Sequence, residues 1–389
     1  MIRLERILIL VLDSLGMGEM PDAAKFGDEG SDTLGHVAAS HPLHIPHLQE
    51  LGIANIRPLR HLPSMAAPKA CFGKATLASN GKDTTSGHWE MMGLILETPF
   101  PTYPNGFPSS VIRSFEKAIG RKTLANRAIS GTEIIQQLGQ EHMRTGYPIV
   151  YTSADSVFQV AAHEDVLPVG ELYRICQLAR SQLDGEHEVG RVIARPFVGT
   201  PGNFARTERR KDFAIEPFIP TVLDRLEEKR IPVICVGKVA SIFCYRGTGR
   251  EVKSKNNRDA TQKVLESMSR LDRGLIFANF NDFDMLYGHR NDVEGYARAL
   301  EEFDVDLRAI LASLRQDDLL ILTSDHGCDP ATASTDHSRE YALLLAYSKG
   351  LHGNVNLGTR ASLADIGATV AENFAVSSPA GRSFLQNLK

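Results

Sequence analysis

The sequence of 389 residues predicts an α/β fold: a doubly wound, mostly parallel sheet core that carries an inserted α+β cap domain. Three observations predict it. Several apolar runs lack polar alternation, a long amphipathic segment separates two of them, and the middle third of the chain differs in composition. A chain of this length can form one large domain together with a second, smaller one.

The apolar runs are the expected strands of the core. Apolar runs without alternation are typical of strands that are buried on both faces of a parallel sheet. Five such runs occur in the sequence, at residues 7–13 (ILILVLD), 232–237 (PVICVG), 274–282 (GLIFANFND), 318–327 (DLLILTSDHG) and 341–348 (YALLLAYS).

The segment 291–318 is expected to form an amphipathic helix over this sheet, because apolar residues recur in it every three or four positions. These residues are Val293, Tyr296, Leu300, Phe303, Leu307, Leu311 and Leu314. A strand, a helix and a strand in this order predict a right-handed crossover, which is the unit of a doubly wound core.

The middle third is expected to be the inserted domain. Proline and glycine become frequent there, as in ETPFPTYPNGFP, and the strand candidates at 147–163 and 191–198 are more mixed in polarity. We therefore expect a catalytic core formed by residues 1–97 and 213–389, and a cap formed by residues 98–212.

Composition excludes several classes of partner. The net charge of -4 provides no positive field for nucleic acid, and no apolar run approaches the roughly 20 residues of a membrane span. The five cysteines are scattered, odd in number and without a Cys-x-x-Cys pair. This pattern indicates a reducing compartment, hence the cytoplasm, and argues against a thiolate zinc site.

Acidic residues end or follow three of the expected strands, and histidines accompany them. The carboxyl ends of parallel strands meet at one edge of a sheet, where ligands bind. Each residue alone has an ordinary interpretation as a turn or cap residue. Together they predict a site for two cations, since clustered carboxylates repel each other without one. Asp and His ligands suit Mn²⁺ or Zn²⁺ better than Ca²⁺. The residues are Asp13, Asp282, Asp284, His289, Asp325, His326 and His337.

The segment NGKDTTSGHWE, residues 80–90, is expected to form a turn followed by a helix that begins near His88, with one of its hydroxyls as the cap. The start of a helix stabilises an anion. An ordinary capped helix without any ligand is the alternative for this segment taken alone.

The chain resembles the phosphopentomutase family of the alkaline phosphatase superfamily. The motifs that carry the resemblance are ILVLDSLGMGEMPDA, GKDTTSGHWEMMG, YTSADSVFQVAAHE, RVIARPFVG, FDMLYGHRND, TSDHGCDP and TDHSREY. They extend over essentially the whole chain, including the inserted part and the final ADIGATVAENF.

The resemblance implies a role for each matching residue of the core. It implies one metal held by Asp13, Asp325 and His326 with the hydroxyl of Thr84, and a second held by Asp284, His289 and His337. Thr84 then carries the phosphoryl group, and Lys82 neutralises its charge. Cys328 stands where some relatives have Asn, and Ser338 where Thr is commoner; neither position is a ligand.

The resemblance also implies the substrate and its contacts. It implies interconversion of ribose 1-phosphate or 2-deoxyribose 1-phosphate with the 5-phosphate through a phosphothreonine and a 1,5-bisphosphate. The implied cofactors are two Mn²⁺ or similar cations and an activator such as glucose 1,6-bisphosphate, in a cytoplasmic enzyme of nucleoside catabolism. The residues implied in sugar phosphate binding are Ser153, Asp155, Arg191, Ile193, Arg206 and Lys238.

Two alternatives remain open. One is a metal-dependent phosphomonoesterase or phosphoglycerate mutase of the same superfamily, which would share the metals but have a different cap. The other is a binder of metal or sugar phosphate without activity, which would be expected to lack a ligand or the nucleophile. The oligomeric state does not follow from the sequence.

Overall fold

The computed structural model describes residues 4–153 and 156–388. The chain forms two compact units, Met1–Pro99 with Pro217–Lys389 and Phe100–Glu216. The second unit thus starts two residues after the expected border at 98 and ends four residues after the one at 212.

The first unit is built on a nine-stranded sheet. Its order is β11 (Arg250–Val252), β10 (Val233–Val236), β12 (Gly274–Phe280), β1 (Arg6–Leu12), β13 (Asp318–Thr323), β14 (Glu340–Tyr347), β3 (Cys71–Ala75) and β15 (Asn356–Arg360), with β2 (Gly16–Glu19) paired to β14. The first five of these strands are parallel to one another.

One strand of this sheet differs from the expected direction. The run 341–348 forms β14, which is antiparallel to both β13 and β3. A parallel connection requires a crossover, usually a helix, and the segment 324–339 between β13 and β14 contains no helix. It is instead a long loop at the carboxyl end of β13.

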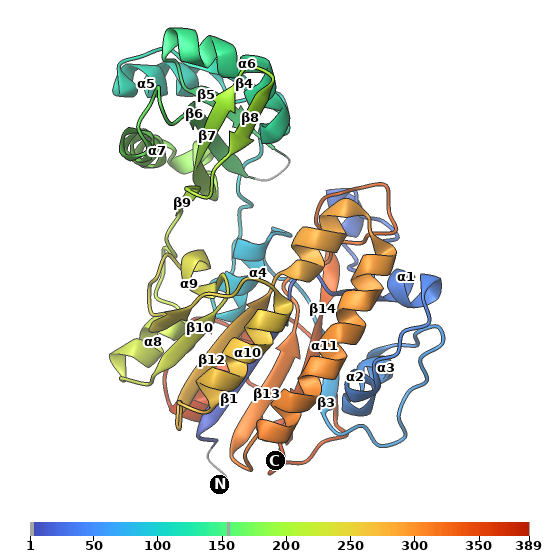
Figure 1. The fold of residues 1–389 in the computed structure, drawn as a ribbon. Coiled ribbons are helices and arrows are strands. Elements are labelled where there is room, and N and C mark those ends of the chain that lie inside the picture. Colours follow the sequence, from blue (N-terminus) through green and yellow to red (C-terminus); the bar gives the residue numbers. More distant parts are fainter. Residues whose placement is uncertain (1–3, 154–155, 389) are drawn as a thin grey trace. The chain divides into compact units, whose positions relative to one another are not determined.

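Helices cover both faces of the sheet (Figure 1). Side chains alternate along β12: Ile276, Ala278 and Phe280 belong to the core beneath α10 and α11, while Phe277 stacks on His88 of α4. The helices are α1 (Thr33–Ser40), α2 (Pro46–Leu51), α3 (Ile53–Ile56), α4 (Thr84–Met91), α8 (Val222–Glu228), α9 (Val239–Ile242), α10 (Asn257–Met268), α11 (Val293–Ser313) and α12 (Ala364–Phe374), with short turns η1 (Ala23–Phe26), η3 (Phe283–Tyr287), η4 (Gly288–Arg290) and η5 (Leu385–Leu388).

The second unit has its own six-stranded mixed sheet and its own hydrophobic core. The strands are β4 (Leu124–Ala128), β5 (Ile149–Thr152), β6 (Val157–His163), β7 (Arg191–Thr200), β8 (Asn203–Arg206) and β9 (Lys211–Ala214). The helices are α5 (Ser109–Ile119), α6 (Gly131–Thr145), α7 (Val169–Gln182) and the turn η2 (Gly185–His187). The predicted α/β class with an inserted α+β domain is confirmed.

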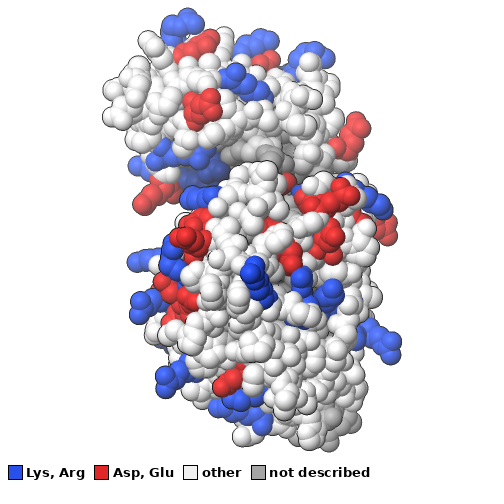
Figure 2. All heavy atoms as spheres, turned by 90° about the vertical axis from the view of Figure 1, so that its right-hand side faces the viewer, with Lys and Arg blue, Asp and Glu red and all other residues white. Residues whose placement is uncertain are grey.

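The distribution of charged side chains on the surface is consistent with the low net charge of the chain. On the face drawn in Figure 2, Lys and Arg side chains are interspersed with Asp and Glu. Within residues 4–153 and 156–388, no helix has the length and apolar character needed to cross a lipid bilayer. All five cysteines are free thiols.

Candidate metal centre

Three acidic residues meet at the carboxyl edge of the core sheet. Asp13 directly follows β1, and Asp325 lies two residues after β13. Asp284 follows β12 within η3, a single π-helical turn of the kind that is frequent at functional sites. All three side chains are buried, which is costly for carboxylates unless a cation or hydrogen bonds compensate.

The first cluster contains Asp13, Asp325 and His326. The Nε2 atom of His326 lies 3.5 Å from Oδ1 of Asp13 and 3.4 Å from Oδ2 of Asp325. The hydroxyl oxygen of Thr84 lies 3.3 Å from the same nitrogen. The structure therefore brings together the four residues of the first implied metal site.

The second cluster is formed around Asp284. Its Oδ2 lies 3.3 Å from Nε2 of His289, and its Oδ1 lies 3.4 Å from Nε2 of His337. The ring of His337 lies against those of His289 and His326, with centroids 4.8 and 4.0 Å apart. The two clusters are thus neighbours, and ligand atoms of Asp284, His326 and His337 also lie within 4.8 Å of one another.

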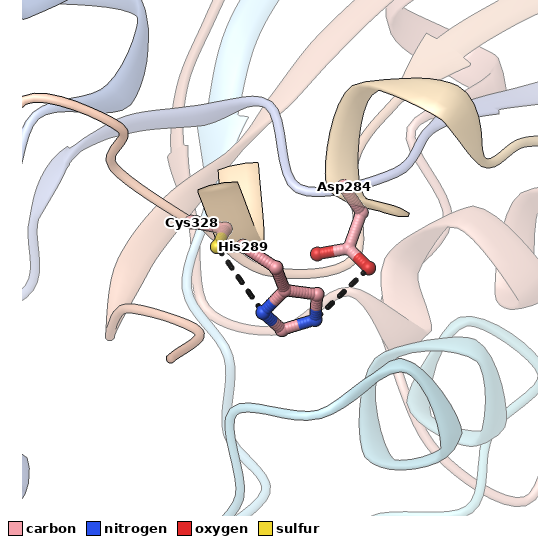
Figure 3. Close-up of side chains that lie close together, drawn as sticks. All are labelled: Asp284, His289 and Cys328. Atoms are coloured by element: carbon pink, nitrogen blue, oxygen red, sulfur yellow. Dashed lines mark hydrogen bonds and ion pairs between the residues drawn. The ribbon is translucent and has the colours of Figure 1, made fainter. Parts of the chain in front are cut away.

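A thiol that the sequence analysis did not count as a ligand, Cys328, lies beside the second cluster, and its sulfur and ligand atoms of Asp284 and His289 lie within 4.8 Å of one another. Figure 3 shows the His289 ring between Asp284 and Cys328, whose Sγ lies 3.9 Å from Nδ1 of His289. Burial raises the pKa of Cys328 to about 11, so without a bound cation the group is a neutral thiol near pH 7. It contacts an implied ligand without the negative charge of a thiolate.

The hydrogen bonds of the carboxylates fit a bound cation. Asp13 Oδ2 accepts a bond of 2.9 Å from the amide of Asn279, and Asp325 Oδ1 accepts one of 3.1 Å from the Ser14 N–H. Their other oxygens, and Oδ1 of Asp284, are buried and have no hydrogen-bond partner among the residues that the structure describes. Each carboxylate therefore keeps a buried oxygen available for a ligand.

The imidazoles fit a cation in the same way. The Nδ1 of His289 donates to the Thr335 carbonyl at 2.7 Å, and the Nδ1 of His326 donates to the Gly327 carbonyl at 3.0 Å. Such bonds fix the tautomer of metal-binding histidines and leave the lone pair on Nε2. In both rings Nε2 is the nitrogen that lies near the carboxylates.

The pKa values of Asp13 and Asp284 are shifted in opposite directions. Burial, together with repulsion from Asp325 and Asp284, raises the pKa of Asp13 well above its ordinary value. Burial would also raise the pKa of Asp284, but His337 and His289 outweigh it and hold that pKa well below the usual range. Cations among these groups would allow all the carboxylates to ionise. The donor set of Asp and His suits a transition metal ion.

The first residue of α4 and the residue that caps it differ from those expected from the sequence. The helix begins at Thr84 and not near His88, and its cap is Asp83 and not a hydroxyl. Oδ1 of Asp83 accepts bonds from the N–H groups of Thr85 and Ser86, at 3.0 and 3.1 Å. Asp is as good a cap as Ser and a better one than Thr. Because this cap occupies two amides of the first turn, these two are not available to an anion.

His88 and Asn279 link this helix to the metal centre, and sequence reasoning assigned neither a role. The Nδ1 of His88 lies 2.9 Å from the Thr84 carbonyl and 3.2 Å from Oδ2 of Asp325. Its Nε2 lies 3.3 Å from the amide nitrogen of Asn279, which also binds Asp13. The position of His88 four residues after Thr84 is the only sequence signal, since i and i+4 share one helix face.

A buried arginine holds the segment that leads to Thr84. The Arg339 guanidinium donates to the carbonyls of Leu77, Ser79 and Gly81 at 2.6–2.8 Å and pairs with Asp22 at 3.0 Å. These contacts fix the backbone that leads into α4.

Lys82 is held by acids of the core. Its ammonium group lies 3.0 Å from both oxygens of Asp28 and 3.4 Å from Asp336. The lysine is therefore ordered two residues before Thr84, but it is shared with two carboxylates.

The residues implied in sugar phosphate binding are scattered over both units. Ser153, Arg191, Ile193 and Arg206 lie in the second unit, Lys238 lies in the first, and Asp155 lies outside the described residues. Arg191 lies 3.8 Å from Asp212, and Arg206 donates to the Tyr151 hydroxyl at 3.2 Å. Ile193 is buried in β7, Ser153 is half-buried, and the exposed Lys238 binds the amide oxygen of Asn281.

Comparisons with known proteins show which family the chain resembles. The sequence profile described as Metalloenzyme superfamily matches residues 5–378. Phosphopentomutase from Caldanaerobacter subterraneus subsp. tengcongensis is 54% identical over 386 residues, which cover 99% of this chain and 98% of that protein. Phosphopentomutase from Acetivibrio thermocellus is 55% identical over 387 residues, covering 99% and 100%. A solved Pyrococcus horikoshii protein has a TM-score of 0.51 at 15% identity, covering 98% of this chain and 100% of its own, a likeness of fold alone.

Proposed function

The chain belongs to the phosphopentomutase family of metalloenzymes, and we propose that it transfers phosphoryl groups between the 1- and 5-oxygens of ribose or deoxyribose through Thr84. The observation that carries this proposal is the position of the Thr84 hydroxyl, 3.3 Å from His326 and at the start of α4. Among the described residues, neither the Thr85 nor the Ser86 hydroxyl forms a hydrogen bond to a side chain of the two clusters, and that of Ser86 donates to Asp83.

The two clusters would hold two divalent cations. Asp13, Asp325 and His326 with Thr84 would hold one, and Asp284, His289 and His337 would hold the other. Bound cations would lower the pKa of the threonine hydroxyl and neutralise the phosphoryl oxygens. We favour Mn²⁺ over Mg²⁺, because three imidazoles belong to the set and Mg²⁺ prefers oxygen ligands.

The chain's own residues position the nucleophile. His88 holds the Thr84 carbonyl at 2.9 Å, and Arg339 fixes the three carbonyls of the preceding segment. A nucleophile that is held in position reacts faster, because no entropy has to be lost to order it during the reaction. Lys82, held by Asp28, would contribute positive charge near the transferred group.

The proposed cycle begins with phosphorylated Thr84. The bond from the Thr84 oxygen to phosphorus breaks as the 5-hydroxyl of a pentose 1-phosphate bonds to that phosphorus and loses its proton. The resulting 1,5-bisphosphate then returns the phosphate of its 1-oxygen to Thr84 and leaves as the 5-phosphate. The second unit would contribute Ser153, Asp155, Arg191, Ile193 and Arg206 to sugar phosphate binding, and would exclude water, which otherwise hydrolyses the phosphothreonine.

The conversion itself tests this proposal. Full-length protein freed of metal with EDTA and given ribose 1-phosphate, a trace of glucose 1,6-bisphosphate and Mn²⁺ should form ribose 5-phosphate, measured by ³¹P NMR. Without added metal it should form none. Formation of inorganic phosphate in place of the 5-phosphate would contradict the mutase reaction, and full activity without metal would contradict the proposed cations. We expect this activity in the cytoplasm, in keeping with the five free thiols.

A further inference from the structure

Two buried polar side chains, His88 and Asn279, lie beside the first cluster but do not belong to the proposed ligand set. His88 is 0% exposed and Asn279 is 1% exposed. Asn279 and Phe277 are two residues apart in β12 and so share one face of the sheet. The His88 ring stacks on Phe277 with centroids 5.7 Å apart. The two polar side chains therefore meet between the sheet and α4.

Asp13 determines how the Asn279 amide is oriented. An ionised carboxylate can only accept hydrogen bonds, so the Asn279 atom that lies 2.9 Å from Oδ2 of Asp13 has to be the amide nitrogen. This nitrogen carries a second hydrogen, and Nε2 of His88 lies 3.3 Å from it. Nε2 therefore accepts the second bond of the amide.

The acceptor role of Nε2 determines the other nitrogen of the ring. A neutral imidazole that accepts at Nε2 carries its proton on Nδ1. Nδ1 donates to the Thr84 carbonyl at 2.9 Å and lies 3.2 Å from Oδ2 of Asp325. The hydrogen bonds thus run in one direction, from the first residue of α4 through His88 and Asn279 to Asp13.

The helix that carries His88 also lies very close to the segment that carries Asp325. A Cβ atom added at Gly87 would lie 2.7 Å from the Cβ of Asp325, so no larger residue fits without a shift of the helix. With α4 held in this way, the His88 ring has a fixed position relative to both carboxylates.

We propose that Asn279 and His88 are positioning residues that act as one bridge, and that this bridge sets the affinity of the first cluster for its cation. The inference deepens the proposed function and rests on it, because the bridge connects Asp13 and Asp325 to the proposed nucleophile. Residues that orient metal ligands through hydrogen bonds contribute about ten- to a hundredfold to metal affinity. All three residues that the bridge contacts belong to the first cluster, so the second cation should not depend on it.

Two substitutions break the bridge with little change in volume. Asn279→Leu removes both N–H groups of the amide, and His88→Phe keeps a flat ring on Phe277 but has no nitrogen. The milder His88→Asn keeps a donor near the position of Nδ1 but cannot reach Asn279. The control is Asn281→Leu, two residues further along, whose amide oxygen accepts from Lys238.

Calorimetric titration of the full-length, metal-free proteins with Mn²⁺ measures the affinity for each cation. Each substitution is also placed in two backgrounds that separate the clusters. His337→Ala leaves only the first cluster able to bind, and Asp325→Asn leaves only the second.

We expect the dissociation constant of the first cation to rise at least about tenfold in Asn279→Leu, His88→Phe and His88→Asn. That of the second cation should change less than about twofold, and the control should match the parent for both. The double variant Asn279→Leu/His88→Phe should be no more than about threefold weaker than the weaker single variant, because residues that act as one unit are not additive.

Three results would overturn the bridge. An unchanged affinity for the first cation would show that the two side chains do not position its ligands. Equal weakening of both cations would indicate general damage to the fold. Effects that multiply in the double variant would show that the two residues act separately.

The outcome is separable from that of the proposed function. If the bridge variants lose the first cation selectively but the unmutated chain does not convert ribose 1-phosphate to ribose 5-phosphate, the mutase reaction is wrong while the bridge stands. If the conversion occurs and all variants bind the first cation like the parent, the reaction stands and the bridge is wrong. An unmutated chain that binds fewer than two cations would overturn both.

Discussion

The candidate metal centre of the first unit and the residues of the second unit that we propose to bind sugar phosphate differ in how their polar groups are satisfied. In the centre, Asp13, Asp284 and Asp325 each keep a buried oxygen without a hydrogen-bond partner among the described residues. In the second unit, Arg191 lies 3.8 Å from Asp212, and Arg206 donates to Tyr151. The carboxylates of the centre thus keep acceptors for a cation, whereas these two arginines of the second unit already have partners in the protein.

Because of this difference, we expect substitutions in the candidate metal centre to reduce activity more than substitutions in the second unit. Removing a proposed metal ligand would leave buried charges uncompensated and would remove a cation that we propose to stabilise the phosphoryl oxygens. Removing an arginine of the second unit weakens binding but leaves the phosphoryl transfer groups intact. The predictions below test whether the two regions separate in this way.

The largest effect is expected for Asp284→Asn. We expect it to lose tightly bound metal and to lower kcat/KM by more than about a thousandfold, because a bound cation supplies several kcal/mol of stabilisation in such transfers. The matched control is Asp282→Asn, two residues away, whose carboxylate binds the N–H of Asn257. Metal analysis by mass spectrometry and a turnover assay measure both variants. Two equivalents of metal in Asp284→Asn would refute the proposed ligand set.

A large effect on stability is expected for Arg339→Ala. Its buried guanidinium binds three carbonyls and the half-buried Asp22, and each buried acceptor left without a donor costs about 1 to 3 kcal/mol. Urea unfolding should show this loss, with disorder of the segment before Thr84 in hydrogen exchange. The exposed Arg298→Ala, which removes a pair with Glu294 on one helix, should cost less than about 0.5 kcal/mol. Equal stability of the two variants would show that Arg339 does not hold this segment.

A moderate effect is expected in the second unit. Arg191→Ala should raise the KM for ribose 1-phosphate about tenfold, since a guanidinium binds phosphate through charge-assisted bonds. Hydrolysis of p-nitrophenyl phosphate and the metal content should stay unchanged. Arg209→Ala removes an exposed arginine that pairs with Glu164 at 2.9 Å and serves as the control. If metal binding fell in Arg191→Ala, the two regions would not be separable.

The smallest effect concerns pH and the second unit alone. Nδ1 of His142 donates to the Tyr147 carbonyl at 2.7 Å, and its Nε2 accepts from the His163 N–H at 2.9 Å. The bond at Nε2 requires the neutral ring, because a protonated ring nitrogen cannot accept, and burial lowers the pKa of His142. The His142 side chain therefore binds a proton more readily in the unfolded chain than in the folded one. Its contribution to the free energy of unfolding is fully present above about pH 6.5, the pKa in the unfolded chain. It is lost as the pH falls from there toward the lower pKa of the folded state. The limiting slope is about 1.4 kcal/mol per pH unit.

Hydrogen exchange of β5 and β6 at pH 7.5 and 5.5 measures this effect. His142→Gln, which does not titrate, should reduce the difference between the two pH values. Protection that is the same at both pH values in the unmodified chain would show that His142 does not limit the stability of this unit.

The sequence alone predicted the strands of the core sheet, because buried strands appear as runs of apolar residues. Apolar runs predicted the strands β1, β10, β12 and β13. Asp13, Asp284 and Asp325 lie near one another because parallel strands end at one edge, whereas Asp282, which was also expected there, instead accepts the N–H of Asn257. The antiparallel direction of β14 was not predictable, since a strand's direction depends on its connection and not on its own residues.

The supporting contacts of the site were also beyond the sequence. His88, Asn279 and Arg339 act through bonds to residues up to 317 positions away along the chain, and no local pattern encodes such pairs. The start of α4 at Thr84 was misread because three hydroxyls compete as caps with Asp83. In the second unit, the arginines could be named only through family resemblance, because an arginine pattern alone does not distinguish a ligand site from a surface pair.

The central claim is that Thr84 accepts the phosphoryl group, and intact mass spectrometry with peptide mapping tests it most directly. Metal-loaded protein mixed with glucose 1,6-bisphosphate should gain one phosphoryl group, located on Thr84, while Thr84→Ala gains none and Thr85→Ala still gains one. Phosphate found on Thr85 or Ser86, or a Thr84→Ala variant that still converts ribose 1-phosphate to ribose 5-phosphate, would contradict the account.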